Sequence, residues 1–203
     1  MKSNLSKLIA SLSIIIVFSS CNSEKKEINY DFTTVFETSN GTETATYDQV
    51  IEYYTQLADQ YPSVAIYNMD RTDSGKRLHL VTFNPNRSFE YEFSDEKDQN
   101  ILLINNGIHP GESDGIDASM MLIRDLAQNK IETPVNTIIA VIPVYNIGGA
   151  LNRNSTSRTN QNGPDEYGFR GNARNYDLNR DFIKSDTKNA RAQGRIILFL
   201  NHK

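Results

Sequence analysis

A histidine and a glutamate stand three residues apart in the stretch His109-Pro110-Gly111-Glu112. Imidazole nitrogen and carboxylate oxygen are both zinc ligands, so this spacing lets two side chains of one loop bind the same ion. The bare pattern is weak, because 3 histidines and 25 acidic residues in 203 produce it by chance with odds of about one in three. The alternative is an imidazole hydrogen-bonded within a loop, beside a solvated carboxylate.

The residues around this pair strengthen the metal interpretation. Ile101 to Ile104 is a short apolar run typical of a buried parallel strand, and Ile116 to Gln128 has the periodicity of a helix. Glycine and proline punctuate the crossing between them, and Asp114 is suited to cap the helix. His109 and Glu112 therefore follow the carboxyl end of a strand, where open α/β sheets bind their ligands.

The remaining patterns predict the elements that position this loop. The sequence predicts an amphipathic helix over Thr46–Gln60 and strands over Val64–Met69, Leu78–Asn84 and Thr137–Val144. Strand, helix and strand across the central stretch form one right-handed βαβ unit. The fold class is therefore α/β, with a mixed, largely parallel central sheet flanked by helices. His79 lies within a predicted strand, and we interpret it as a strand histidine without a site role.

Asn146 to Tyr176 is rich in Asn, Gly, Arg and Ser and predicts a long loop. It carries Arg153, Arg158, Arg170 and Arg174. One interpretation is a solvated loop whose arginines pair with Asp165 and Glu166; the other is a cationic wall that binds an anionic substrate group.

The charge balance argues against nucleic acid as a partner. The chain has 21 Lys and Arg against 25 Asp and Glu, and the formal net charge is −4. Without Lys2 and Lys7, which lie in the first twenty residues, 19 basic residues face 25 acidic ones, a net charge of −6. Phosphate binding needs a basic face, which this composition does not favour.

The first twenty residues predict an export signal. Lys2 and Lys7 precede an apolar core of eleven residues, Leu8 to Phe18, which is too short to span a bilayer as a helix. Small residues then precede Cys21, the only cysteine, so no intrachain disulfide is possible. This order resembles a bacterial lipoprotein signal, which implies lipidation of Cys21 and a lipid-anchored place in the cell envelope. The alternative is a signal peptide with an incidental thiol. Residues 21–40 are polar and predict a flexible tether.

Two motifs in this order resemble the zinc metallocarboxypeptidases of the M14 type: His109-Pro110-Gly111-Glu112 after a central strand, and Asp177-Leu178-Asn179-Arg180-Asp181-Phe182 about seventy residues later. The predicted helix before Tyr61-Pro62 and the Ser74-Gly75-Lys76 turn also look like the start of that family's catalytic domain. The resemblance covers roughly Thr46 to Ala192.

The resemblance implies roles for individual residues. His109 and Glu112 match two of the family's three zinc ligands, and Asn179 and Arg180 match the pair that binds the terminal carboxylate of a peptide. Arg158, or else Arg153, matches the arginine that stabilises the oxyanion. The implied reaction is zinc-dependent hydrolysis of a C-terminal peptide bond. Many family members carry an arginine where this chain has Gly111.

The family's third zinc ligand, a histidine, and its glutamate base lie further along the domain. Asp186 to Leu200 predicts a helix, which leaves His202 directly after it; a strand over Ile196–Leu200 would instead make His202 a ligand. Glu166 is the last glutamate. We therefore expect residues 41–203 to be a C-terminally truncated carboxypeptidase-like domain with weak zinc binding and no turnover. The alternatives are a non-catalytic lipoprotein that binds peptide ends, or a related zinc amidase or deacylase.

Overall fold

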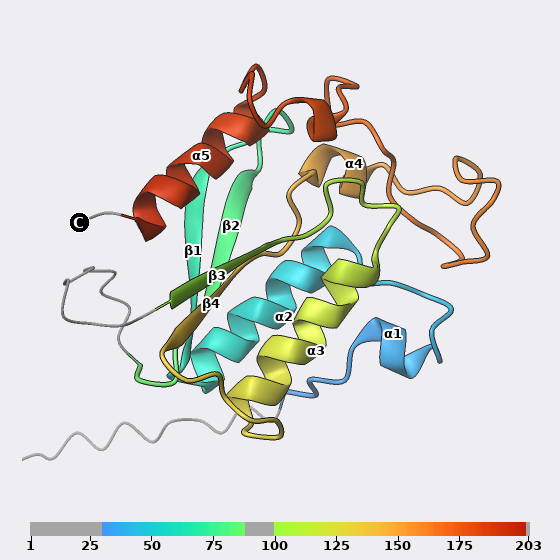
Figure 1. The fold of residues 1–203 in the computed structure, drawn as a ribbon. Coiled ribbons are helices and arrows are strands. Elements are labelled where there is room, and N and C mark those ends of the chain that lie inside the picture. The colour runs from blue at the N-terminus through green and yellow to red at the C-terminus, as the bar shows by residue number, and fades with distance from the viewer. Residues whose placement is uncertain (1–29, 88–99, 202–203) are drawn as a thin grey trace, which may run out of the picture.

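The computed structural model describes residues 30–87 and 100–201. Its helices and strands are α1 (Val35–Thr38), α2 (Tyr47–Gln60), β1 (Val64–Arg71), β2 (Arg77–Phe83), β3 (Asn100–Asn105), α3 (Asp114–Ala127), β4 (Thr137–Ile142), α4 (Ile147–Leu151), the 3₁₀ helix η1 (Leu178–Arg180) and α5 (Lys188–Leu200). Helices α2 and α3 lie side by side against one face of the sheet, and α5 packs on β1 and β2 from the other face (Figure 1). No helix in the described ranges has the length and apolar character needed to cross a membrane.

The predicted α/β class is confirmed, and the sheet is mixed. The described strands have the order β1-β2-β4-β3, and β3 pairs with β4 in parallel from Asn100↔Thr137 to Asn105↔Ile142. The β1–β2 and β2–β4 pairs are both antiparallel. Only β2 therefore runs against the other described strands, so β1, β3 and β4 share one direction in this mixed sheet.

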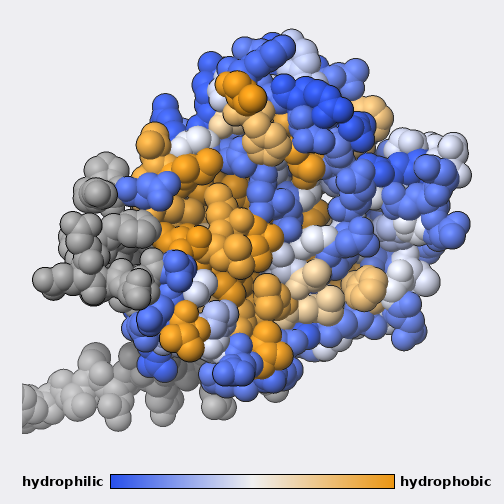
Figure 2. All heavy atoms as spheres, viewed as in Figure 1, coloured by the Kyte–Doolittle hydropathy of each residue, from blue (hydrophilic) through white to orange (hydrophobic). Residues whose placement is uncertain are grey.

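The apolar run of β3 predicts a strand buried on both faces, and the structure differs. Strand β3 is the last strand at one side of the described sheet, and Leu102 is 53% exposed. Ile101, Leu103 and Ile104 are only partly buried. Hydrophobic residues gather on the surface over β3 and beside α5 (Figure 2). A continuous apolar run is typical of a strand that has a neighbouring strand on each side, whereas β3 has one neighbouring strand among the described residues.

The predicted helices are confirmed to within two residues. Thr46 begins α2 with a capping box, in which its side chain accepts from the Gln49 amide and the Gln49 side chain accepts from the Thr46 amide. Helix α3 starts two residues before the predicted Ile116: Ser113 occupies the N-cap position, and Asp114 is the first helical residue instead of the cap. Thr187 caps α5, and this helix continues to Leu200. The alternative strand over 196–200 is therefore wrong.

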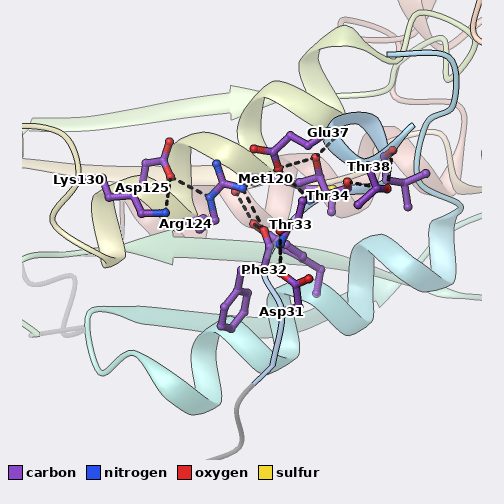
Figure 3. Close-up of polar contacts among 12 residues, drawn as sticks. Asp31, Phe32, Thr33, Thr34, Glu37, Thr38, Met120, Arg124, Asp125 and Lys130 are labelled. Atoms are coloured by element: carbon purple, nitrogen blue, oxygen red, sulfur yellow. Dashed lines mark hydrogen bonds and ion pairs between the residues drawn. The ribbon is translucent and has the colours of Figure 1, made fainter. Parts of the chain in front are cut away.

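The tether predicted for residues 21–40 is too long, because its described part folds onto the domain. The Phe32 side chain is buried in the core, and Thr34 caps the short helix α1 together with Glu37. The Arg124 guanidinium on α3 donates to the Phe32 carbonyl oxygen at 3.0 Å and to the Glu37 carboxylate at 2.6 Å (Figure 3). The folded domain therefore begins before residue 41. The other domain limits stay predictions.

Several predicted features lie outside the described residues. They are the export signal, Cys21 and His202. Within the described part, His79 lies on β2 with its Nδ1 3.4 Å from the Tyr47 hydroxyl, and burial lowers its pKa. That place agrees with a strand histidine.

Candidate functional site

The loop after β3 leaves the sheet beside the loop after β4. The Asn106 carbonyl oxygen accepts from the Tyr145 amide at 2.8 Å, and the Gly107 carbonyl oxygen accepts from the Asn146 amide at 3.0 Å. Gly107 has φ of +64°, a conformation that a side chain would oppose. His109 and Glu112 thus lie past the carboxyl end of a parallel strand, as the sequence predicts.

His109 is buried and held by one carboxylate. Its Nε2 lies 2.8 Å from Oδ1 of Asp177, and the imidazole is 5% exposed. An ionised carboxylate only accepts hydrogen bonds, so Nε2 carries a hydrogen, and in the neutral ring the lone pair is then on Nδ1. The ring nitrogen available to a metal ion is therefore Nδ1.

Asp177 stays ionised because it is surrounded by donors. Its Oδ2 accepts from Nε and Nη2 of Arg170 at 3.2 and 2.9 Å, and its Oδ1 also accepts from the Asn179 amide. Burial alone would raise the pKa of Asp177, but the hydrogen bonds from His109 and Arg170 outweigh it and lower the pKa to about 2. The Asp177 carboxylate is therefore ionised at neutral pH and accepts a hydrogen bond from the His109 ring.

Glu112 faces the free nitrogen of His109. The distance from His109 Nδ1 to Glu112 Oε1 is 3.6 Å, and the same oxygen accepts from Arg158 Nη2 at 2.9 Å. Burial by itself raises the pKa of Glu112. The hydrogen bond and the charge of Arg158 lower this pKa by more, so the net shift is downward. Glu112 is half-exposed and ionised at neutral pH.

These two side chains fit a zinc ion. Zinc binds imidazole nitrogen at about 2.0–2.1 Å and carboxylate oxygen at about 2.0–2.2 Å, and tetrahedral geometry then places the two ligand atoms about 3.4 Å apart. The observed 3.6 Å is close to that value. The donor chemistry agrees as well, because the nitrogen carries a lone pair and the oxygen belongs to an ionised carboxylate.

Across residues 30–87 and 100–201, no group of three His, Cys, Asp or Glu side chains is placed to hold a metal ion. Asp177 does not serve as the third, because it bonds the ring nitrogen of His109 opposite to the one that faces Glu112. Among the described residues, the candidate site therefore has two potential metal ligands, His109 and Glu112.

The long loop places its arginines unequally. Arg158 reaches Glu112, while Arg153 is fixed elsewhere by donating to the carbonyl oxygens of Thr44 and Glu166. Of the two candidates for the oxyanion arginine, the structure brings only Arg158 to the proposed metal ligands.

The cationic wall is thus partly present. Arg170 joins the site through Asp177, but Arg174 lies 3.9 Å from Asp73 on the β1–β2 turn. The alternative pairing with the acidic residues of the loop holds only for Arg153, whose Nε is 3.8 Å from Glu166. The segment is also not wholly a loop, because it contains α4.

Asn179 and Arg180 lie in η1, directly after Asp177, which accepts from the Asn179 amide. Both side chains are exposed. The Arg180 guanidinium donates to the Asn179 carbonyl oxygen at 3.0 Å and forms no ion pair within the described ranges. The structure therefore joins this motif to His109 through a shared carboxylate and leaves the Arg180 guanidinium accessible.

Sequence reasoning missed Asp177 and Asn146 as site residues. Asp177 was visible as the acidic residue before the Asn179-Arg180 pair, but its role depends on which ring nitrogen it meets. Asn146 caps α4 through Gly149 and donates from Nδ2 to the Arg170 carbonyl oxygen at 2.9 Å. Only the three-dimensional arrangement shows that it supports the Arg170 segment.

The site thus consists of an imidazole and a carboxylate that face each other past the carboxyl end of β3 in a mixed α/β sheet. Residues 50–195 match the sequence model described as zinc carboxypeptidase, peptidase M14. This match covers most of the chain, and the protein belongs to that family. A comparison with curated protein sequences gives no match.

Solved structures share the fold. The metallo-carboxypeptidase from Burkholderia cenocepacia superposes with a TM-score of 0.54 and 18% identity, over 75% of this chain and 38% of that one. The metallo-carboxypeptidase from Pseudomonas aeruginosa gives 0.52 and 14%, over 76% of this chain and 36% of that one. This chain thus spans little more than a third of the length of these structures.

Proposed function

We propose that the protein is a zinc-dependent carboxypeptidase-type hydrolase that acts at the C-terminal peptide bond of its substrate. The observation that carries the proposal is the 3.6 Å separation of His109 Nδ1 and Glu112 Oε1. These atoms lie beside Arg158, and a carboxylate next to the Asn179-Arg180 pair fixes the His109 ring. Membership of the zinc carboxypeptidase family supports the assignment.

Each side chain has a distinct part in this proposal. Zinc held by His109 and Glu112 would supply Lewis-acid activation of the peptide carbonyl and of water. Asn179 and Arg180 bind the free carboxylate of the substrate, since a guanidinium fork matches a carboxylate in two hydrogen bonds. Fixing the chain end in this way positions the adjacent peptide bond.

Arg158 serves the developing negative charge on the carbonyl oxygen. Its side chain is 19% exposed, and its guanidinium lies 2.9 Å from a proposed metal ligand, Glu112. A donor held at this place stabilises charge that appears only in the transition state. The Pseudomonas aeruginosa structure of the same fold contains (2-guanidinoethylmercapto)succinic acid, a ligand with carboxylates, which supports a site for such groups.

A second candidate is a protein that binds peptide ends without cleaving them. It is favoured by one observation: within the described parts of the chain, only two metal-binding side chains converge. Two ligands rarely retain zinc against water. In this case the exposed Arg180 would still bind a carboxylate. A related amidase or deacylase would use the same two ligands and would release an acyl group instead of an amino acid.

One experiment on the purified chain distinguishes the two candidate functions. Calorimetry with zinc should show one weak site, and a peptide with a free C-terminus should bind at least tenfold more tightly than its C-terminal amide. Arg180→Met should remove this difference, since it removes the guanidinium. Release of a C-terminal amino acid from the free peptide supports the enzyme, and binding without release supports the second candidate. Equal binding of the acid and the amide would exclude both.

We also propose that the protein is exported and lipid-anchored at the bacterial cell envelope through Cys21. The support is the order of Lys2 and Lys7, the apolar core Leu8–Phe18 and the single cysteine. In the native host, Cys21→Ser should move the protein from the membrane fraction to the soluble fraction. Recovery of both forms in the membrane fraction would contradict the anchor.

A further inference from the structure

Gly111 lies between the two proposed metal ligands, and the space beside it is occupied by Arg158. A Cβ at this position would overlap the Arg158 Nε and would come within 2.7 Å of the Gly168 carbonyl oxygen. The guanidinium of Arg158 therefore lies directly against the Gly111 backbone on its way to Glu112. Any side chain at position 111 would displace Arg158 from this path.

Gln161 connects the same two features from the other side. Its Nε2 donates to the Gly111 carbonyl oxygen at 2.9 Å and to the Gly163 carbonyl oxygen at 2.6 Å. Its Oε1 accepts from Arg158 Nη1 at 3.4 Å. Both amide hydrogens and the amide oxygen are used, and turning the amide over would set N–H against guanidinium and oxygen against carbonyl. The network thus allows one orientation of Gln161.

Few other contacts hold these groups. The Arg158 amide donates to the Tyr167 hydroxyl at 3.1 Å, but within the described parts of the chain its guanidinium donates only to Glu112 and Gln161. Without the Gln161 amide, Arg158 would keep Glu112 as its one partner and would regain rotamer freedom. The Gly111 carbonyl oxygen would at the same time lose its side-chain donor.

We propose that Gln161 is a positioning residue that holds Arg158 and the 109–112 loop in fixed relation. Its side chain bonds to Arg158 and to the Gly111 carbonyl oxygen, and it acts on the site through these two groups. This inference rests on the proposed function for its link to zinc. Supporting groups of this kind alter metal affinity by about 10–100-fold when they are removed.

The test compares Gln161→Leu, which keeps the size and removes every hydrogen bond, with Asn162→Ala at the exposed neighbour. The first measurement is hydrogen exchange at the Glu112 amide, which donates to the His109 carbonyl oxygen at 2.8 Å. We expect exchange at least tenfold faster in Gln161→Leu and unchanged exchange in Asn162→Ala. The second measurement is zinc affinity, which should fall about tenfold in Gln161→Leu only.

The outcomes separate this inference from the proposed function. Unchanged exchange at Glu112 in Gln161→Leu overturns the positioning role, whether or not zinc binds. Faster exchange in a chain that binds no zinc overturns the zinc assignment and leaves the positioning of the loop supported. If Gln161→Leu does not fold, Gln161→Glu serves instead, because it keeps an acceptor for Arg158 and, when ionised, lacks both amide donors. It should likewise speed exchange at Glu112, and no change there overturns the role.

Discussion

Replacing His109 with alanine should abolish zinc binding by the chain. The described part of the site offers two metal-binding side chains, and this change removes the one that is buried and held in the correct tautomer. Calorimetric titration of the purified variant should show no heat above that of dilution. The fold should persist, because the imidazole packs in a loop and not in the hydrophobic core.

The matched control is His79→Ala on β2, which should bind zinc as the parent chain does. Asp177→Asn tests how much the tautomer contributes. An amide at position 177 still holds the ring but no longer selects the Nε2–H form, so zinc affinity should fall by about 10–100-fold. Zinc binding retained in His109→Ala, or lost in His79→Ala, would place the metal elsewhere.

Arg124→Met should lower the free energy of unfolding by about 2–3 kcal/mol. The Arg124 side chain is 10% exposed, and it donates to Glu37, to Asp125 and to the carbonyl oxygen of Phe32. Methionine keeps much of the aliphatic stem and removes every donor, so that partly buried acceptors lose their partner. Urea denaturation measures the difference.

Arg195→Met is the matched control, because Arg195 pairs with Asp70 at 2.7 Å but is 69% exposed. Exposed pairs contribute about 0–1 kcal/mol, so this variant should unfold almost as the parent does. A double-mutant cycle with Glu37→Gln isolates the pair itself. An Arg124→Met loss no larger than that of Arg195→Met would show that α1 is not held by this contact.

The same contact predicts a dependence on pH. The hydrogen bond from Arg124 holds the pKa of Glu37 at about 2, against an ordinary value of 4.5. A carboxyl with a depressed pKa in the folded state stabilises that state fully above its unfolded pKa. The stabilisation is lost as the pH falls through the folded pKa. The difference between the parent chain and Arg124→Met should therefore shrink as the pH falls from about 4.5 to 2.

Local signals in the sequence were sufficient for helices α2, α3 and α5 and for the place of the loop. Thr46 and Thr187 mark helix starts by side-chain capping, which depends only on residues three positions apart. The position of His109 follows from a strand, a glycine turn and a helix in sequence. These features require no knowledge of distant contacts.

Non-local contacts explain what the sequence did not reveal. The partner of the His109 Nε2 is 68 residues away, and the Gly111 carbonyl oxygen meets Gln161 50 residues away. The burial of β3 also depends on which strands lie beside it. An apolar run can have the same composition in a strand inside a sheet and in a strand at its side, so the sequence does not distinguish the two. The choice between Arg153 and Arg158 was likewise decided by the path of a loop without regular periodicity.

The position of β3 has a consequence for work with the isolated chain. In the part that the structure describes, one long side of this strand offers a row of peptide groups flanked by leucine and isoleucine. Such a row is a template onto which any extended polypeptide can add. Where this side of β3 stays uncovered, concentrated samples are therefore expected to form oligomers through strand addition, and dilute conditions suit measurements on the monomer.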